Sequence, residues 1–222
     1  MASYGSWPSP LTADLLAAGG VGVGAASSRT NAAGSTEIWW AEARSTEGGR
    51  IAIVRQLADG TTVDALPAPW SARTAVHEYG GGAWFHGPEH VYFSSWDDQR
   101  LYRIAADTAG TTGVDVEPEA VTPAPEESRA WRYADGRVSP DGTWIVCVNE
   151  DHHSDVTAEH GEVLNSLVAI PAAGGEPVVL SSKTDFVSAP RFSPEGRWLS
   201  WFSWNHPDMP WDQSTLCAAP VW

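Results

Sequence analysis

One eight-residue phrase occurs twice in the sequence and limits the folds that the chain can adopt. Residues 137–144 read RVSPDGTW, and residues 191–198 read RFSPEGRW. In each copy, Pro sets φ for the first corner of a tight turn, and Gly accepts the left-handed conformation that a β-carbon would resist. The segments after the turns, 144–148 and 198–202, are apolar on both faces or nearly so. The phrase therefore predicts a strand, a tight turn and a second strand that is buried between sheets.

Similar strand and turn patterns recur along the chain at intervals of about fifty residues, which is typical of a β-propeller or a solenoid. An ordinary sandwich could hold two such hairpins, but the further repeats favour a propeller. The expected strands are 37–43, 50–57 and 62–66; then 83–85, 90–95, 100–105 and 116–121; then 131–138, 143–149, 165–170 and 176–180; and finally 186–192, 197–203 and 216–221. The predicted fold class is all-β, a partial β-propeller of about four four-stranded blades. The last blade is incomplete, so we expect the propeller to be truncated within it.

The N-terminal segment, residues 1–34, is expected to precede the propeller blades of residues 35–222. Thr12 can cap a short helix over 13–18, which Gly19 would end. No basic region followed by an apolar core marks a signal peptide, and 15–26 is too short and too glycine-rich to span a bilayer. With only two cysteines as well, we expect a reduced, cytoplasmic location.

The net charge argues against two classes of partner. The chain has 28 acidic and 13 basic residues, for a formal charge of −15. Such a charge repels nucleic-acid phosphates and anionic lipid surfaces. We therefore expect neither nucleic acid nor membrane as a partner.

The predicted topology separates two faces of the propeller. In an up-and-down four-stranded blade, successive connections alternate between faces, so the two Ser-Pro-Asp/Glu-Gly turns share one face. The loops 76–80, 149–155 and 204–212 then share the opposite face, and they hold the histidines, acids and spare tryptophans. Function is expected on that second face, because binding residues concentrate on loops.

Four stretches carry a family resemblance: 4–10 (YGSWPSP), 76–82 (VHEYGGG), 135–142 (DGRVSPDG) and 204–212 (WNHPDMPWD). They resemble the N-terminal β-propeller of the prolyl oligopeptidase (S9) family of serine peptidases. The similar branch contains acylaminoacyl-peptidase and dipeptidyl-aminopeptidase-like enzymes, including bacterial aminopeptidases of the puromycin-hydrolase kind. The Ser-Pro-Asp-Gly turn is the least specific of the four, since unrelated TolB-like propellers use it too.

The resemblance implies a propeller that caps an α/β-hydrolase domain of the same parent chain, with substrate held between the two. That domain supplies a Ser nucleophile on a Gly-x-Ser-x-Gly elbow, followed by Asp and His. No Gly-x-Ser-x-Gly occurs in this sequence, so no catalytic residue is assigned and this segment alone is not expected to be catalytic. The expected role is to gate and orient short peptides or aminoacyl amides, without a cofactor. The chain is then part of a peptidase or a silent relative; the alternative is a TolB-like non-catalytic propeller that binds a protein partner.

The candidate substrate-binding residues are Glu78, Tyr79 and His77, which lie just before an innermost strand. The resemblance implies that propeller acids bind the free amino terminus of the substrate, which a carboxylate does through a charge-assisted hydrogen bond. Alternatively, His77 and Glu78 only order their loop, and the glycines that follow let it pass close to a neighbour.

A second group is expected on the substrate-side loop or at the seam with the hydrolase domain, and we favour the seam: Trp204, His206, Asp208, Trp211 and Asp212. A third group has metal-ligand residue types: Glu150, Asp151, His152, His153, Asp155 and His160. Adjacent histidines would point oppositely on a strand, and the spacing matches no known metal site. We predict a solvated loop there, and no metal.

Overall fold

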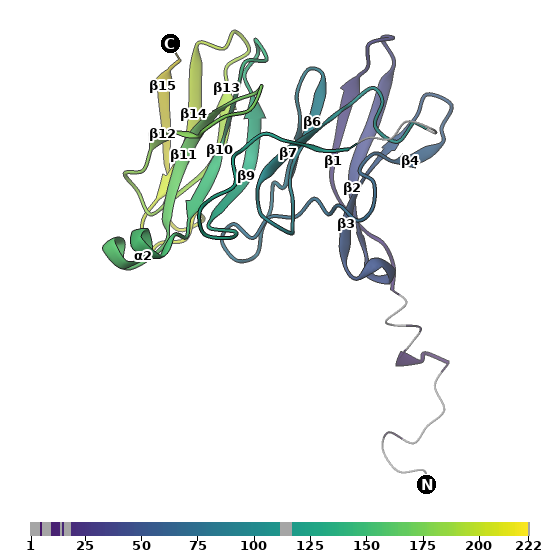
Figure 1. Cartoon of the computed structure of the whole chain (residues 1–222), viewed down its shortest axis with the longest axis horizontal. Coiled ribbons are helices and arrows are strands. Elements are labelled where there is room, and N and C mark those ends of the chain that lie inside the picture. Colours follow the sequence, from purple (N-terminus) through teal and green to yellow (C-terminus); the bar gives the residue numbers. More distant parts are fainter. Residues whose placement is uncertain (1–4, 6–9, 14, 16–18, 112–116, 222) are drawn as a thin grey trace.

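The computed structural model describes residues 5, 10–13, 15, 19–111 and 117–221, which form four antiparallel sheets (Figure 1). The first sheet contains β1 (Gly22–Thr30), β2 (Thr36–Arg44), β3 (Arg50–Gln56) and β4 (Thr62–Asp64); the second contains β5 (Trp84–His86), β6 (His90–Ser94), β7 (Leu101–Ala105) and β8 (Glu119–Ala120); the third contains β9 (Trp131–Val138), β10 (Trp144–Asp151), β11 (Leu164–Pro171) and β12 (Val178–Ser181); the fourth contains β13 (Phe186–Phe192), β14 (Trp198–Trp204) and β15 (Thr215–Pro220).

The sheets are four successive blades of a β-propeller. Within each sheet the strands neighbour one another in chain order, which is the up-and-down arrangement expected from the sequence. In Figure 1 the first blade, in purple and blue, lies at one side, and the fourth, in yellow-green, lies at the other. The predicted all-β propeller class is thereby confirmed, and every predicted strand overlaps an observed one. Position 116, where one expected strand begins, lies outside the described residues.

One strand was not predicted. Strand β1 lies in the segment 1–34, for which we expected a helix and no strand, and it pairs with β2 from Gly22 opposite Ala43 to Thr30 opposite Thr36. The sequence GVGAASSRT has few large apolar side chains, so it lacks the alternation that marks a half-buried strand. Backbone pairing defines this strand, since most of its residues are exposed. The first blade therefore begins within the segment 1–34 and not at residue 35.

The helices differ from the expectation in one place. At the N-terminus, the backbone N–H of Leu15 donates to Oγ1 of Thr12 over 3.0 Å, as predicted for the cap. Positions 14 and 16–18 of the expected helix, and most of the motif 4–10, lie outside the described residues. An unpredicted helix, α2 (Ser154–His160), follows β10, and it ends at Gly161, which has a φ of 80°. A 3-10 turn, η1 (Ser45–Glu47), joins β2 to β3. No helix in the described part of the chain is long and apolar enough to cross a lipid bilayer.

Three apolar clusters hold the blades together. One cluster joins the first and second blades around Trp39 and Phe93, the next joins the second and third around Tyr133, and the last joins the third and fourth around Leu167. The inner strand β9 packs against both β5 and β13. The contact with β5 is close: a Cβ at Gly136 would lie 2.1 Å from the ring of Phe85. The blades therefore interlock through side chains.

The fourth blade presents an apolar surface on its far side. Trp198, Phe202 and Leu216 are 53%, 41% and 65% exposed, whereas the alternate residue Leu199 is buried against the third blade. Phe202 and Leu216 are paired across β14 and β15, so they share one face of the sheet. Large apolar side chains that are grouped on one exposed face promote association.

We expect the isolated chain to self-associate through this face. The sedimentation coefficient should rise with protein concentration, and the double variant Phe202→Thr with Leu216→Thr should reduce the rise. The charge of −15 opposes association only weakly, because physiological salt screens charges beyond about 8 Å. A chain that sediments as a monomer at every concentration would contradict this expectation.

The pH dependence of stability should contain a contribution from His86. The ring of His86 lies 5.1 Å from the ring of Trp39 and 5.3 Å from that of Trp84, and burial lowers its pKa to about 4. In the unfolded chain the pKa of histidine is about 6.5, so the unfolded state binds this proton more tightly. The stabilising effect of neutral His86 is complete above pH 6.5, and it is lost as the pH falls towards 4.

The free energy of unfolding should fall by about 3 kcal/mol over that range through this residue alone. Carboxylates also titrate near the lower end, so the comparison variant is His86→Phe, which keeps a ring and removes the proton site. Denaturant unfolding at a series of pH values should give a shallower decline for His86→Phe. Parallel curves for the two proteins would show that His86 does not contribute.

Candidate substrate-facing site

Three loops that are far apart in the sequence meet on one face of the blades. The ring of His77, in the loop between β4 and β5, lies 5.7 Å from the ring of Phe186 and 6.4 Å from that of Trp204. The backbone N–H of His77 also donates to Oε1 of Glu150, at the end of β10, over 2.6 Å. The two Ser-Pro-Asp/Glu-Gly turns lie beside each other and apart from these loops. A Cβ added at Gly196 of one turn would be 3.4 Å from Pro140 of the other. The structure thus brings together the loops that the topology placed on one face.

The loop that holds His77 is tightly wound. His77 and Glu78 have φ values of 54° and 64°, in the left-handed region that residues with side chains seldom adopt. Gly80 follows with a φ of 73°, and a Cβ at that position would lie 2.5 Å from the backbone oxygen of Thr74. Such a conformation persists only where surrounding contacts enforce it.

Glu150 supplies those contacts. Its side chain is 3% exposed, and its Oε1 accepts the hydrogen bond from the His77 backbone. Its Oε2 lies 2.9 Å from Nε2 of His152 and 4.0 Å from Nη1 of Arg132. A buried carboxylate is tolerated only with such partners, so Glu150 joins the end of β10 to the loop between β4 and β5.

Glu78 differs from Glu150 in being open to solvent. Its side chain is 79% exposed, and Nη1 of Arg132 donates to its Oε1 over 2.7 Å. This hydrogen bond lowers the pKa of Glu78 below its usual value, so the carboxylate is ionised at neutral pH. Arg132 also donates to the backbone oxygen of Ala75, which fixes the guanidinium between the strand and the loop. An accessible, oriented carboxylate of this kind can bind a cation.

The other two predicted substrate-binding residues lie in different surroundings. Tyr79 is 79% exposed, and its ring lies 6.0 Å from that of His77. The side chain of His77 is 17% exposed and is packed beside Phe186 and Trp204. Glu78 and Tyr79 are therefore accessible to a ligand, and His77 lies beneath them.

The second predicted group divides in the same way. Trp204 is buried, and its ring stacks on that of Phe186 at 5.3 Å with an angle of 14°. The ring of His206 lies 4.9 Å from that of Phe186, edge-on at 71°. Trp211 is 75% exposed, and Met209, two residues earlier, is 40% exposed. This loop thus has an anchored end near Trp204 and an apolar tip at Met209 and Trp211.

Hydrogen bonds within the loop explain how its tip is held. The carboxylate of Asp212 accepts from the Met209 backbone over 3.3 Å, and the N–H of Asp212 donates to the oxygen of Met209 over 2.9 Å. The N–H of Asp208 donates to the backbone oxygen of Asn205. Asp185, just before β13, accepts from the His206 backbone over 2.8 Å. The carboxylate of Asp212 and the backbone hydrogen bonds of the loop therefore shape the turn that exposes Trp211.

The acid and histidine stretch 150–160, which runs from the end of β10 through α2, is more ordered than the solvated loop that we predicted. Nδ1 of His153 lies 2.6 Å from Oδ1 of Asp151, whose other oxygen accepts from Nε1 of Trp131 over 3.1 Å. The prediction is wrong for this half of the stretch because Glu150 and Asp151 still belong to β10. Asp155 and His160 lie on α2 and are exposed, as expected. Among the described residues, no group of three or more His, Cys, Asp or Glu side chains is arranged to hold a metal.

The described residues contain no activated nucleophile. None of their Ser, Thr or Cys side chains forms a hydrogen bond with a histidine ring, which acyl transfer by a Ser–His or Cys–His pair requires. Both cysteines are free, and burial raises the pKa of the Cys147 thiol, which keeps it protonated. In the described residues, therefore, none of these side chains is paired with a base that could activate it.

Two residues of this face were missed from the sequence. Arg132 is the second residue of β9, and Phe186 is the first of β13. Both lie where an inner strand begins, on the same face as the loops that were singled out. A search of that topological position would have found them.

No family model and no curated protein sequence matches the chain. Among solved structures, it is similar to a puromycin-hydrolyzing peptidase of Mycobacterium tuberculosis, with 36% identity and a TM-score of 0.81 over 98% of this chain and 33% of that one. It is also similar to a puromycin hydrolase, with 34% identity and a TM-score of 0.78 over 99% of this chain and 33% of that one.

The chain belongs with the N-terminal β-propellers of the prolyl oligopeptidase (S9) family. It spans about a third of the length of these two relatives. A further structure, TolB from Acinetobacter baumannii, shares 13% identity and a TM-score of 0.52 over 83% of this chain, and it covers 38% of that one. At that identity the likeness shows the propeller fold alone. The resemblance to the S9 propeller that we noted in the sequence is confirmed.

The contacts of Glu150 predict its effect on stability. Glu150→Ala should lower the free energy of unfolding by about 3 kcal/mol, because Arg132, His152 and the His77 backbone would lose their buried partner. Glu150→Gln should cost less, since its amide oxygen can still accept from His77. Denaturant unfolding of the two variants measures this difference. Equal, small losses below about 1 kcal/mol would show that the loop is held by other contacts.

Proposed function

We propose that this chain is the propeller part of an S9-type serine aminopeptidase. In this role it admits and orients short peptides or aminoacyl amides for an α/β-hydrolase domain of the same parent protein. The observation that supports this best is the 36% identity with a puromycin-hydrolyzing peptidase over 98% of the chain. The nucleophile, base and oxyanion donors would come from the hydrolase domain, since the described residues hold no such set. Free cysteines fit the reducing cytoplasm in which we place the protein.

The carboxylate of Glu78 is proposed to bind the free amino group of the substrate. Its Oε1 is held by Arg132, and Oε2 is left for the ammonium, which would donate a charge-assisted hydrogen bond to it. Arg132 fixes the direction of the carboxylate, while it also neutralises part of its charge. The neighbouring ring of Tyr79 offers an exposed apolar wall for the side chain of the first residue. Such a site would favour substrates with an unblocked amino terminus.

The exposed tip at Met209 and Trp211 is proposed to contact the hydrolase domain. Trp211 is a large apolar residue held out by the turn that Asp212 and Asp208 shape. Exposed aromatic residues on an ordered loop are common anchors of interfaces. The ordered end near Trp204 and His206 would then line the space between the two domains.

A chimera tests this proposal. This chain would replace the matching third of the Mycobacterium tuberculosis puromycin-hydrolyzing peptidase, and release of the aminoacyl group from puromycin would be measured. We expect turnover by the chimera and none by this chain alone. Glu78→Gln in the chimera should lower kcat/KM by roughly 10- to 100-fold for substrates with a free amino group, and much less for N-blocked ones.

Glu89→Gln, in the exposed turn between β5 and β6, is the matched control and should leave both substrate classes unaffected. Equal losses for free and blocked substrates would show that Glu78 only orders its loop. A chimera that melts cooperatively yet cleaves neither class would contradict the peptidase role. Turnover by this chain alone that survives serine-hydrolase inhibitors would contradict the assignment of the chemistry to another domain.

A further inference from the structure

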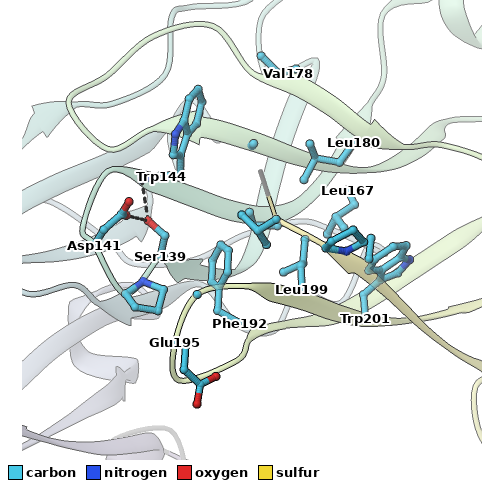
Figure 2. A pocket seen from close by; sticks show the side chains of 17 residues that line it. Ser139, Asp141, Trp144, Leu167, Val178, Leu180, Phe192, Glu195, Leu199 and Trp201 are labelled. Atoms are coloured by element: carbon cyan, nitrogen blue, oxygen red, sulfur yellow. Dashed lines mark hydrogen bonds between the residues drawn. The ribbon is translucent and has the colours of Figure 1, made fainter.

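A cavity of about 360 Å³ lies between the third and fourth blades, at the end where the tight turns gather (Figure 2). Its walls are side chains of the two facing sheets: Trp144, Val146, Leu167, Ala169, Val178 and Leu180 from the third blade, and Phe192, Leu199, Trp201, Ala219, Pro220 and Val221 from the fourth. Cavities of this size are sufficient for a small ligand. It lies at the opposite end of the blades from the loop of Glu78.

The walls of this cavity are apolar but incompletely covered. Trp144 and Val178 are 41% and 52% exposed, and Leu180, Phe192 and Trp201 are only partly buried. Leu167 and Leu199, at the base, are buried in the cluster between the blades. Figure 2 shows the ring of Phe192 between the turn residues and the inner leucines. An apolar molecule that entered here would cover surface which the protein itself leaves exposed.

The polar groups at the mouth are carboxylates. Asp141 and Glu195 belong to the two tight turns. These turns lie side by side, since a Cβ added at Gly196 of one turn would be only 3.4 Å from Pro140 of the other. Ser139 and Thr143 donate hydrogen bonds to Oδ1 of Asp141, and they lower its pKa, so it is ionised at neutral pH. None of the described residues that line the cavity is a lysine, an arginine or a histidine. Its mouth is therefore negative, and its walls are apolar and partly aromatic.

We propose that this cavity binds a small amphiphilic cation, an alkyl- or aryl-ammonium compound. The apolar part lies between the sheets, against Phe192 and Trp201. The ammonium group lies at the mouth beside Asp141 and Glu195. The face of Trp144 adds cation–π attraction for that group, which quaternary ammonium ligands use widely. The site shares no residue with the proposed substrate site, so the two proposals are tested independently.

The probe is octyltrimethylammonium, used with the full chain below the concentration at which micelles form. Binding is measured by titration calorimetry at a protein concentration where sedimentation shows one species. We expect one molecule to bind per chain. Octyl sulfate, which has the same alkyl length and the opposite charge, should bind at least roughly tenfold more weakly.

Two charge variants distinguish binding at this site from non-specific attraction of the cation to an acidic protein. Glu195→Lys should weaken binding of the probe by roughly tenfold or more, because it places a cation at the mouth. Glu159→Lys changes the net charge equally on exposed α2, and it should change the affinity less than about twofold. Leu180→Trp, which fills the cavity from β12, should abolish binding while cooperative melting shows that the chain is folded. Ala219→Phe fills the cavity from β15 and provides a second test if Leu180→Trp does not fold.

Four results would overturn the proposal. The first is no binding of the cation at millimolar concentration to the folded chain. The second is an equal affinity for octyl sulfate, which would show apolar binding without charge selection. The third is equal weakening by Glu195→Lys and Glu159→Lys, and the fourth is full binding by the folded filling variants. Either of the last two would place the cation elsewhere on the surface.

Discussion

The central strands of the third blade are apolar on both faces, and neighbouring sheets cover both of them. In β10 the residues Ile145, Val146, Cys147 and Val148 are all at most 3% exposed, so the third blade is buried from both sides. This constraint sets the order of the structure, because successive sheets must stack in a row as the chain proceeds. It also sets the directions of the loops. Stacked up-and-down sheets send alternate connections to opposite ends, and the loops that hold His77, Glu150 and Trp204 are separated from the tight turns for that reason.

One buried carboxylate, that of Glu150, orders the loop on one face of the stacked blades. Glu150 is the penultimate residue of β10 and accepts a hydrogen bond from the backbone of His77, 73 residues earlier. The left-handed loop that it holds presents Glu78 and Tyr79 to solvent and keeps His77 beneath. The exposed functional candidates thus depend on a residue that is itself inaccessible. Their positions follow from this internal polar contact together with the packing of His77 beside Phe186 and Trp204.

Much of the fold and part of the site could be predicted from the sequence. The strands were recognisable because apolar runs such as 144–148 are bounded by turns whose glycine and proline have definite backbone requirements. Strand β1 could not be recognised, because its small residues leave no apolar pattern, and its position is set by pairing with β2. The topology predicted which loops share a face. It could not predict that Glu150 would contact His77, or that Arg132 would contact Glu78, because these contacts depend on side-chain reach across blades.

Arg132 is shared between two acids. Its guanidinium donates to Glu78 and lies 4.0 Å from Glu150, so one positive charge faces two negative ones. Its Nη1 donates to Glu78 and to the backbone of Ala75, whereas its buried Nε has no hydrogen-bond partner. These three charged side chains leave an excess of negative charge at this point of the surface. Cations in solution are therefore drawn towards the loop before any contact forms, over a distance of about 8 Å at physiological salt. The association rate of a cation with this face is therefore higher in dilute salt and lower in concentrated salt. This kinetic property follows from the imbalance of one guanidinium and two carboxylates.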